Sequence, residues 1–198
     1  MSNLAILLLA AGASKRMGSP KQLLPWGETH LIEHQINSLR LLQLPLYVVL
    51  GANAEEISKV ITHKKELCIC ENKDWSKGMG HSIAFGVSEI LSQSPSVEGI
   101  LIALVDQPFI TSAHYLRLIN HFLTNKETII VSESKEGYWS PPVLFGKKEF
   151  SKLQQLEGDE GAMKIITSQK EKVQAILCKT SLADMDTPEA YRKLRKDH

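Results

Sequence analysis

The sequence has 198 residues, which is long enough for one domain with a substantial buried core. Its apolar fraction of 43% and charged fraction of 23% are ordinary for a soluble globular protein. The net charge of +1 argues against a protein whose main task is to bind nucleic acid, because phosphate contacts along a nucleic acid usually require a basic surplus.

The chain begins with a short apolar run, residues 4–9 (LAILLL), which predicts a buried strand. No segment reaches the ~18–20 apolar residues that a membrane span requires. The run also lacks a basic leader and a cleavage region, so it does not resemble a signal peptide. The three cysteines form no even disulfide set, and Cys68 and Cys70 fit core positions better than metal ligation. We therefore expect a cytoplasmic protein with no membrane association.

Further along the chain, strand-like apolar runs alternate with amphipathic segments, which predicts a three-layer α/β domain over residues 1–198. The runs at 4–9 and 99–105 are apolar throughout, as in parallel strands that are buried on both faces. The expected strands are residues 4–9, 46–50, 67–70, 99–105, 128–132, 142–145 and 173–177. The expected helices are residues 31–42, 54–63, 80–92, 112–124, 147–156, 159–169 and 187–196. Ligands of open parallel sheets bind beyond the carboxyl ends of the strands, so the chemistry should follow the strands.

The loop after the first strand has the composition of a phosphate-binding loop. Residues 10–21 read AAGASKRMGSPK, and their small side chains let backbone N–H groups approach a phosphate chain. Arg16 offers a fork of donors and Lys21 a compact charge. The loop matches neither the Walker pattern nor the dinucleotide fingerprint. The alternative is an ordinary strand–helix turn with solvated cations.

Carboxylates follow two later strands. Asp106 ends the run at 99–105, where it could hold Mg²⁺ together with substrate phosphates. Its alternative is a helix N-cap, although Thr111 is better placed for that role. Asp184 and Asp186 precede Thr187-Pro188, a strong helix start, so either could be a metal ligand or part of the turn.

Several motifs, in order along the chain, resemble those of the MobA-like nucleotidyltransferases, and in particular their molybdenum cofactor cytidylyltransferase branch. The first is residues 7–26, LLLAAGASKRMGSPKQLLPW, which resemble LAAGxSxRMGxxKxLLPW. The others are NKDWSKGMGHS at 72–82, DQP at 106–108, GDEGA at 158–162 and DMDTPE at 184–189. The resemblance implies a Rossmann-like fold of the glycosyltransferase-A kind with a mostly parallel sheet.

The resemblance also implies residue roles. Arg16, Lys21 and Asp106 would be catalytic, with Arg16 on the β and γ phosphates and Lys21 on the α phosphate. Asp106 and Asp186 would hold Mg²⁺. The nucleotide would be bound by Ala10, Ala11, Gly12, Ala13, Ser14, Arg16, Lys21, Gly80 and Ser82. Two departures from the family pattern stand out, namely His81 in place of a small residue and residues 139–142 (WSPP) in place of a Gly-x-Pro element.

The activity so implied is transfer of CMP from CTP to molybdopterin, or molybdenum cofactor, with release of pyrophosphate. The product would serve a molybdenum hydroxylase apo-enzyme. Three alternatives stay open: a sugar- or polyol-phosphate acceptor, GTP as the donor, and a non-catalytic cofactor-binding chaperone that would release no pyrophosphate. Asp159 is either a helix cap or a contact to the acceptor, and Trp26 and Trp75 are expected to be packing residues.

Overall fold

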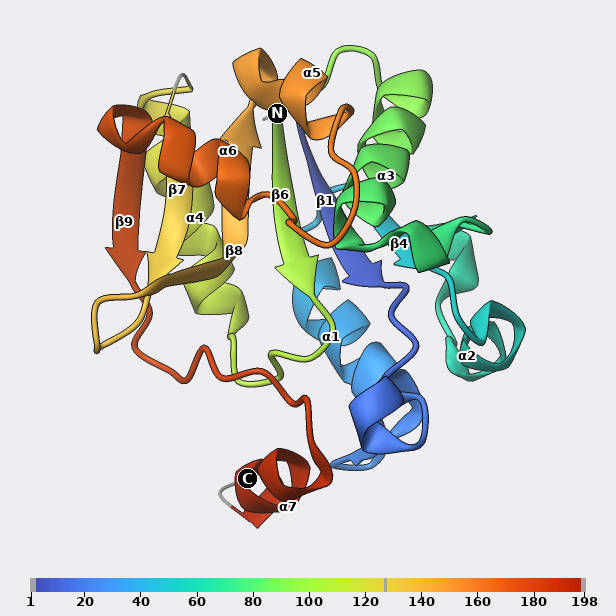
Figure 1. Cartoon of the computed structure of the whole chain (residues 1–198). Helices are drawn as coiled ribbons and strands as arrows, with labels where there is room; N and C mark the ends of the chain where they lie inside the picture. Colours follow the sequence, from blue (N-terminus) through green and yellow to red (C-terminus); the bar gives the residue numbers. More distant parts are fainter. Residues whose placement is uncertain (1–2, 127, 197–198) are drawn as a thin grey trace.

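The computed structural model describes residues 3–126 and 128–196, in which a seven-stranded sheet lies between two layers of helices (Figure 1). The strand order across the sheet is β5-β4-β1-β6-β8-β7-β9. These strands are β1 (Leu4–Ala10), β4 (Leu46–Leu50), β5 (Cys68–Glu71), β6 (Gly99–Leu104), β7 (Ile129–Glu133), β8 (Trp139–Gly146) and β9 (Val173–Leu177). A separate two-stranded ribbon consists of β2 (Pro25–Trp26) and β3 (Thr29–His30).

The sheet is mostly parallel, as predicted. β1 pairs in parallel with both β4 and β6, and the pairs β4–β5 and β7–β9 are also parallel. β8 alone among these strands is antiparallel to its neighbours, β6 and β7. It is also longer than the expected 142–145, because Trp139 and Ser140 continue the pairing with β7. The prediction of a three-layer, Rossmann-like α/β fold is confirmed.

Alternate residues of β1 pack into two separate cores, which explains why its sequence is apolar throughout. Leu4, Ile6 and Leu8 face the core that includes α1 and α4, whereas Leu7 and Leu9 face the core that includes α3, α5 and α6. The helices are α1 (Leu31–Arg40), α2 (Ala54–Val60), α3 (Met79–Gln93), α4 (Ser112–Thr124), α5 (Phe150–Leu153), α6 (Met163–Ser168) and α7 (Pro188–Lys196). None of the described helices is long and apolar enough to cross a membrane.

Two of the predicted helices are much shorter than expected. The sequence predicts helices over 147–156 and 159–169, but α5 covers only Phe150–Leu153 and α6 only Met163–Ser168. Gly161, inside the second expected helix, has a positive φ of 55°, which interrupts a right-handed helix, and in the first expected helix Lys147–Glu149 form a short 3-10 helix ahead of α5. The residues between the two helices instead form a loop that reaches α3.

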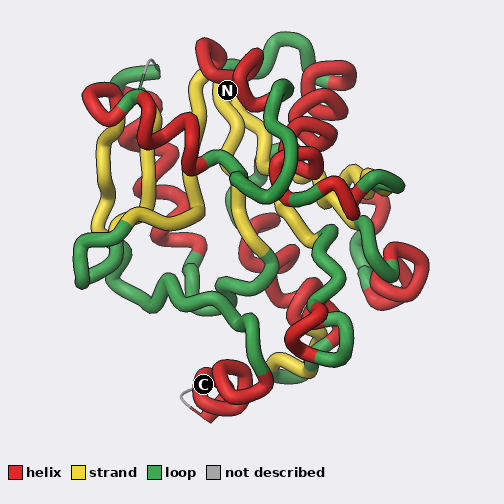
Figure 2. Tube along the Cα trace, in the orientation of Figure 1, coloured by secondary structure: helices red, strands yellow, loops and turns green. Residues whose placement is uncertain are grey.

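The order in which successive strands are added to the sheet reverses between β1 and β6, which are themselves parallel. β4 and β5 lie on one side of this pair, and the later strands lie on the other. Loops gather at the edge where β1 and β6 end, and after β9 the chain crosses below the sheet to α7 (Figures 1 and 2). The backbone N–H of Met185 donates to the carbonyl of Asp106 (3.0 Å), and Tyr191 Oη donates to the carbonyl of Pro25 (2.8 Å). The last segment is thereby held against the point where open α/β sheets bind ligands.

Candidate active site

The loop after β1 is closed by a buried glutamine. Gln22 is fully buried and its Nε2 donates to the carbonyls of Ala10 (2.7 Å) and Gly12 (2.9 Å). Ser14 has a left-handed backbone, with φ 53°, and its Oγ accepts a hydrogen bond from the Lys21 backbone N–H (3.0 Å). The loop therefore folds back on itself and delivers Lys21 to the end of the sheet. The sequence analysis did not single out Gln22. The only local indication was its position as the one amide side chain in the otherwise apolar stretch QLLPW (residues 22–26).

Lys21 lies between two carboxylates that are far away in sequence. Its Nζ is 2.5 Å from Asp106 Oδ2 and 2.9 Å from Asp186 Oδ1. Arg16 Nη2 binds the other oxygen of Asp186 at 2.6 Å. The side chains of Lys21 and Asp106 are only 12% and 13% exposed, so this pair is largely shielded from water. The structure thus brings together the four charged residues on which the predicted catalysis and metal binding depend.

The pKa values of this cluster follow from burial and from the mutual charges. Burial opposes the charge of Lys21, but the ion pairs with Asp106 and Asp186 outweigh it and raise the pKa of Lys21 above its ordinary value. Burial opposes the charge of Asp186 too, but Lys21 and Arg16 outweigh it and hold the pKa of this carboxyl below its usual range. Burial, reinforced by the charge of Asp106, raises the pKa of Asp184 to about 6.

Neither capping alternative describes the carboxylates of this cluster. Thr111 is the N-cap residue of α4, and the Thr187 Oγ1 accepts from the Ala190 backbone N–H (3.2 Å) at the start of α7. Asp186 instead binds Arg16 and Lys21. Asp184 accepts a hydrogen bond from Gln107 Nε2 (2.9 Å).

The cluster has an oxygen that suits a cation. Asp106 Oδ1 is buried and has no hydrogen-bond partner among the described residues, although its sister oxygen is paired with Lys21. Buried polar atoms are nearly always bonded, so this oxygen is open to a ligand such as a cation. Magnesium is typically held by one or two carboxylates together with substrate phosphates, and Asp106 and Asp186 supply such a set.

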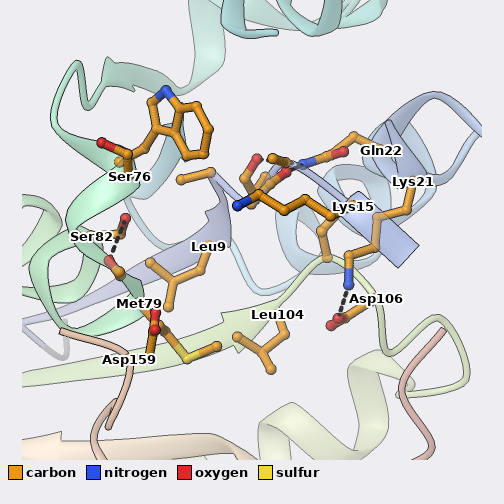
Figure 3. Close-up of a pocket in the computed structure, with 17 residues that line it drawn as sticks. Leu9, Lys15, Lys21, Gln22, Ser76, Met79, Ser82, Leu104, Asp106 and Asp159 are labelled. Carbon is orange, nitrogen blue, oxygen red and sulfur yellow. Dashed lines mark hydrogen bonds and ion pairs between the residues drawn. The ribbon is translucent and has the colours of Figure 1, made fainter. Parts of the chain in front are cut away.

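A pocket of about 360 Å³ opens beside the cluster, within the size range of small-molecule sites (Figure 3). Among the predicted residues, those that line it are Ala10, Ala11, Gly12, Ala13, Lys21, Ser82 and Asp106. Ser14, Arg16 and Asp186 border a second hollow, which shares Gly12, Lys15 and Lys21 with the first. Pocket residues that the sequence analysis did not assign to the nucleotide include Leu9, Lys15, Met79, Leu104 and Asp159. Trp26 is buried packing, as predicted, but Trp75 lines the pocket.

The first turn of α3 contributes one predicted residue to the pocket and one to packing. Ser82 lines the pocket, and its Oγ accepts from Asn72 Nδ2 (3.1 Å). Gly80 does not line it, because its N–H donates to the carbonyl of Gly158 (2.7 Å). A Cβ at Gly80 would lie 2.6 Å from the carbonyl oxygen of Glu157. Gly80 therefore permits close contact between two loops.

Comparison with known proteins places the chain in a family. Residues 6–173 match the family described as the MobA-like NTP transferase domain. The chain is 33% identical to the purine catabolism protein PucB of Bacillus subtilis, over 96% of this chain and 95% of PucB. It is 25% identical to the molybdenum cofactor cytidylyltransferase of Escherichia coli, over 47% of this chain and 48% of that protein.

Solved structures give the same result. A homologue of Mycobacterium tuberculosis Rv0371c from Mycobacterium sp. strain JC1 superimposes with a TM-score of 0.87 at 31% identity, covering 98% of this chain and 96% of the homologue. Rv0371c of M. tuberculosis in complex with manganese superimposes with a TM-score of 0.79 at 25% identity, covering 98% of this chain and 99% of the other. The chain belongs to the MobA-like NTP transferase family and has the fold of a nucleotidyltransferase.

Proposed function

We propose that this nucleotidyltransferase moves CMP from CTP to molybdopterin, or to the molybdenum cofactor, and releases pyrophosphate. The observation that carries the proposal is the cluster of Lys21, Arg16, Asp106 and Asp186 at the mouth of the pocket. A group of paired cations and carboxylates beside a small-residue loop suits a metal-bound triphosphate. The molybdenum cofactor cytidylyltransferase of E. coli is a relative of this chain, and its reaction supports the choice of CTP and molybdopterin.

In the proposed reaction, a phosphate oxygen of the acceptor attacks the α phosphorus of CTP in line, and pyrophosphate leaves. The acceptor phosphate is already an anion, so the chain needs no side-chain nucleophile and no general base. The obstacle is repulsion between anions, and catalysis therefore consists of positioning and charge neutralisation. Mg²⁺, held by Asp106 and Asp186, would neutralise phosphate oxygens when it is bound.

Two cations of the loop, Lys21 and Arg16, have roles in this scheme. The Lys21 ammonium has Asp106 and Asp186 as its partners, and we expect it to exchange them for oxygens of the α phosphate. Arg16 is 70% exposed at its side chain and reaches Asp186 from the rim, where it can hold the leaving pyrophosphate. Backbone N–H groups of residues 10–14 would bind the phosphates that Arg16 does not reach.

We keep a sugar- or polyol-phosphate acceptor as an alternative, because the charged cluster does not by itself distinguish one phosphorylated acceptor from another. The non-enzymatic alternative is a protein that carries finished cofactor to a molybdenum hydroxylase. Such a carrier performs no phosphoryl transfer, so it would not require the Lys21–Asp106 pair.

The test is release of pyrophosphate from each NTP in the presence of molybdopterin or of a panel of sugar and polyol phosphates. It should be run with Mg²⁺ and with Mn²⁺, since a relative is known as a manganese complex. We expect release with CTP and molybdopterin together. Release only with a sugar phosphate would replace the acceptor, and cofactor binding without any release would favour the carrier.

Ala11→Gly should relax the preference for CTP over GTP. Ala11 lines the pocket, is 6% exposed and is held through its carbonyl by the Ala52 N–H (3.0 Å). Its methyl group leaves less room for a bicyclic purine than glycine would. One methyl is worth ~1–3 kcal/mol of discrimination, so the preference should weaken without inverting. The measurement is kcat/KM for both nucleotides.

Ala52→Gly is the matched control, because Ala52 is equally buried but does not line the pocket. It should leave the ratio of the two kcat/KM values unchanged. A wild-type enzyme that prefers GTP would overturn the cytidylyl assignment itself. An unchanged ratio in Ala11→Gly would remove only Ala11 from the explanation.

A further inference from the structure

Two sequence motifs that lie 80 residues apart form one rigid corner of the pocket. Gly78 has φ 108°, and a Cβ placed on it would lie 2.3 Å from the carbonyl oxygen of Gly158. A Cβ on Gly80 would meet the carbonyl of Glu157, and the Gly80 N–H donates to the Gly158 carbonyl (2.7 Å). Any side chain at either glycine would push the 157–161 loop away. The two glycines therefore hold this loop in the wall of the pocket.

The residue that this corner presents to the pocket is Asp159. Its carboxylate lies beside Gly78, 2.7 Å from where a Cβ would be, and it lines the cavity. It does not cap α6, whose N-cap is Ala162, three residues later. Within residues 3–126 and 128–196 the structure gives Asp159 no hydrogen bond or ion pair, whereas the next residue, Glu160, binds Lys164 (2.9 Å). Asp159 is thus an exposed acceptor group at the pocket.

Asp159 lies at the end of the pocket away from the phosphate-binding cations. Figure 3 shows it beside Met79, across the pocket from Lys21 and Gln22. A carboxylate there would repel a phosphate, and it suits a part of a substrate that carries hydrogen-bond donors such as N–H groups. Met79 is 47% exposed although it is apolar, and Leu104 lines the same cavity. An acceptor carboxylate next to apolar side chains suits a flat heterocycle with donors on one edge.

We propose that Asp159 recognises the amino group and the adjacent ring N–H of a 2-amino-4-oxopyrimidine edge, which here is the pterin of the acceptor. The two carboxylate oxygens match two parallel N–H donors, as they match the fork of an arginine. Cytosine has its amino group beside a ring-nitrogen acceptor, which a carboxylate would repel, so CTP is a poor partner. Guanine has the same amino group beside a ring N–H, so the guanine base of GTP is the other ligand with the two donors that Asp159 would recognise. The proposal rests on the proposed function for the identity of the acceptor.

The test compares binding of pterin with binding of lumazine, its 2-oxo analogue, by quenching of their fluorescence. Wild type should bind pterin about tenfold or more tightly than lumazine, because a hydrogen bond to a charged group is worth ~1.5–3 kcal/mol. Asp159→Asn should bind the two within about threefold of each other, since an amide can both donate and accept. Glu160→Gln is the matched control and should keep the wild-type ratio.

The affinity for CTP, measured by calorimetry without acceptor, should be the same in Asp159→Asn and in wild type. Equal binding of pterin and lumazine by wild type, or loss of CTP affinity in the variant, would overturn the proposal. A loss of GTP affinity instead would keep the edge recognition and assign it to the nucleotide, against the cytidylyl function. Pterin discrimination without any CMP transfer to molybdopterin would sink the proposed function and leave the role of Asp159 standing.

Discussion

Lys21→Ala is expected to lower turnover by about 10²–10³-fold while the protein stays folded, because a charge that stabilises the developing α-phosphoryl group is lost. The ammonium lies within 2.9 Å of two carboxylates and the Lys21 side chain is only 12% exposed, so its charge acts in a site that is largely shielded from water. The measurement is kcat for pyrophosphate release at saturating CTP and acceptor. KM for CTP should change less than kcat, because the contact strengthens in the transition state.

Two companion variants make this result specific. Lys65→Ala removes an exposed lysine that does not line the pocket, and it should behave as wild type. Lys21→Arg keeps the charge with a different shape and should recover only part of the rate. Circular dichroism checks the fold. Turnover close to wild type in folded Lys21→Ala would show that the α-phosphoryl charge is neutralised elsewhere.

Asp106→Asn is expected to abolish detectable transfer at ordinary Mg²⁺ concentrations, because an amide lacks the charge that binds a hard cation. The backbone link from the Met185 N–H to the Asp106 carbonyl does not depend on the side chain, so the α7 segment should stay in place. The variant also removes the stronger partner of Lys21 and puts an N–H donor close to its ammonium. When Asp106→Asn is titrated with Mg²⁺, we therefore expect only a small part of the wild-type activity to return at high metal concentration.

Asp74→Asn is the matched control for this carboxylate, because Asp74 pairs with Lys77 at the surface (3.1 Å) and does not line the pocket. It should leave the Mg²⁺ dependence unchanged. If Asp106→Asn shows the wild-type rate and the wild-type Mg²⁺ dependence, the metal is bound by other residues.

The buried Gln107 explains how Asp186 is positioned. Its Nε2 donates to Asp184 Oδ1 (2.9 Å), Ser140 Oγ (2.9 Å) and the carbonyl of Leu182 (3.2 Å). These bonds tie the end of β6, the start of β8 and the segment before α7 into one network. Gln107 follows Asp106 directly, so the residue next to one carboxylate of the cluster anchors the segment that carries the other.

The sequence by itself determined the elements whose signals are local. The all-apolar run of β1 predicted a strand buried on both faces, and Leu7 and Ile6 do pack into opposite cores. Thr187-Pro188 predicted the start of α7, and Thr187 does cap it. The sequence also placed the loop of residues 10–18 and Asp106 together, since the carboxyl ends of parallel strands share one edge of a sheet.

Only the tertiary structure decided which distant groups meet at that edge. Asp186 follows β9, at the far side of the sheet, and nothing local predicts that its chain returns below the sheet to meet Lys21 (Figure 1). Nothing local predicts either that Gly80 contacts residues 157–158 or that Asp159 lines the pocket. The spacing of apolar residues along the sequence predicts which side of its own helix or strand a residue occupies. Contacts between loops depend instead on strand order and on the path of the connections, which are fixed when the two cores close around the whole sheet.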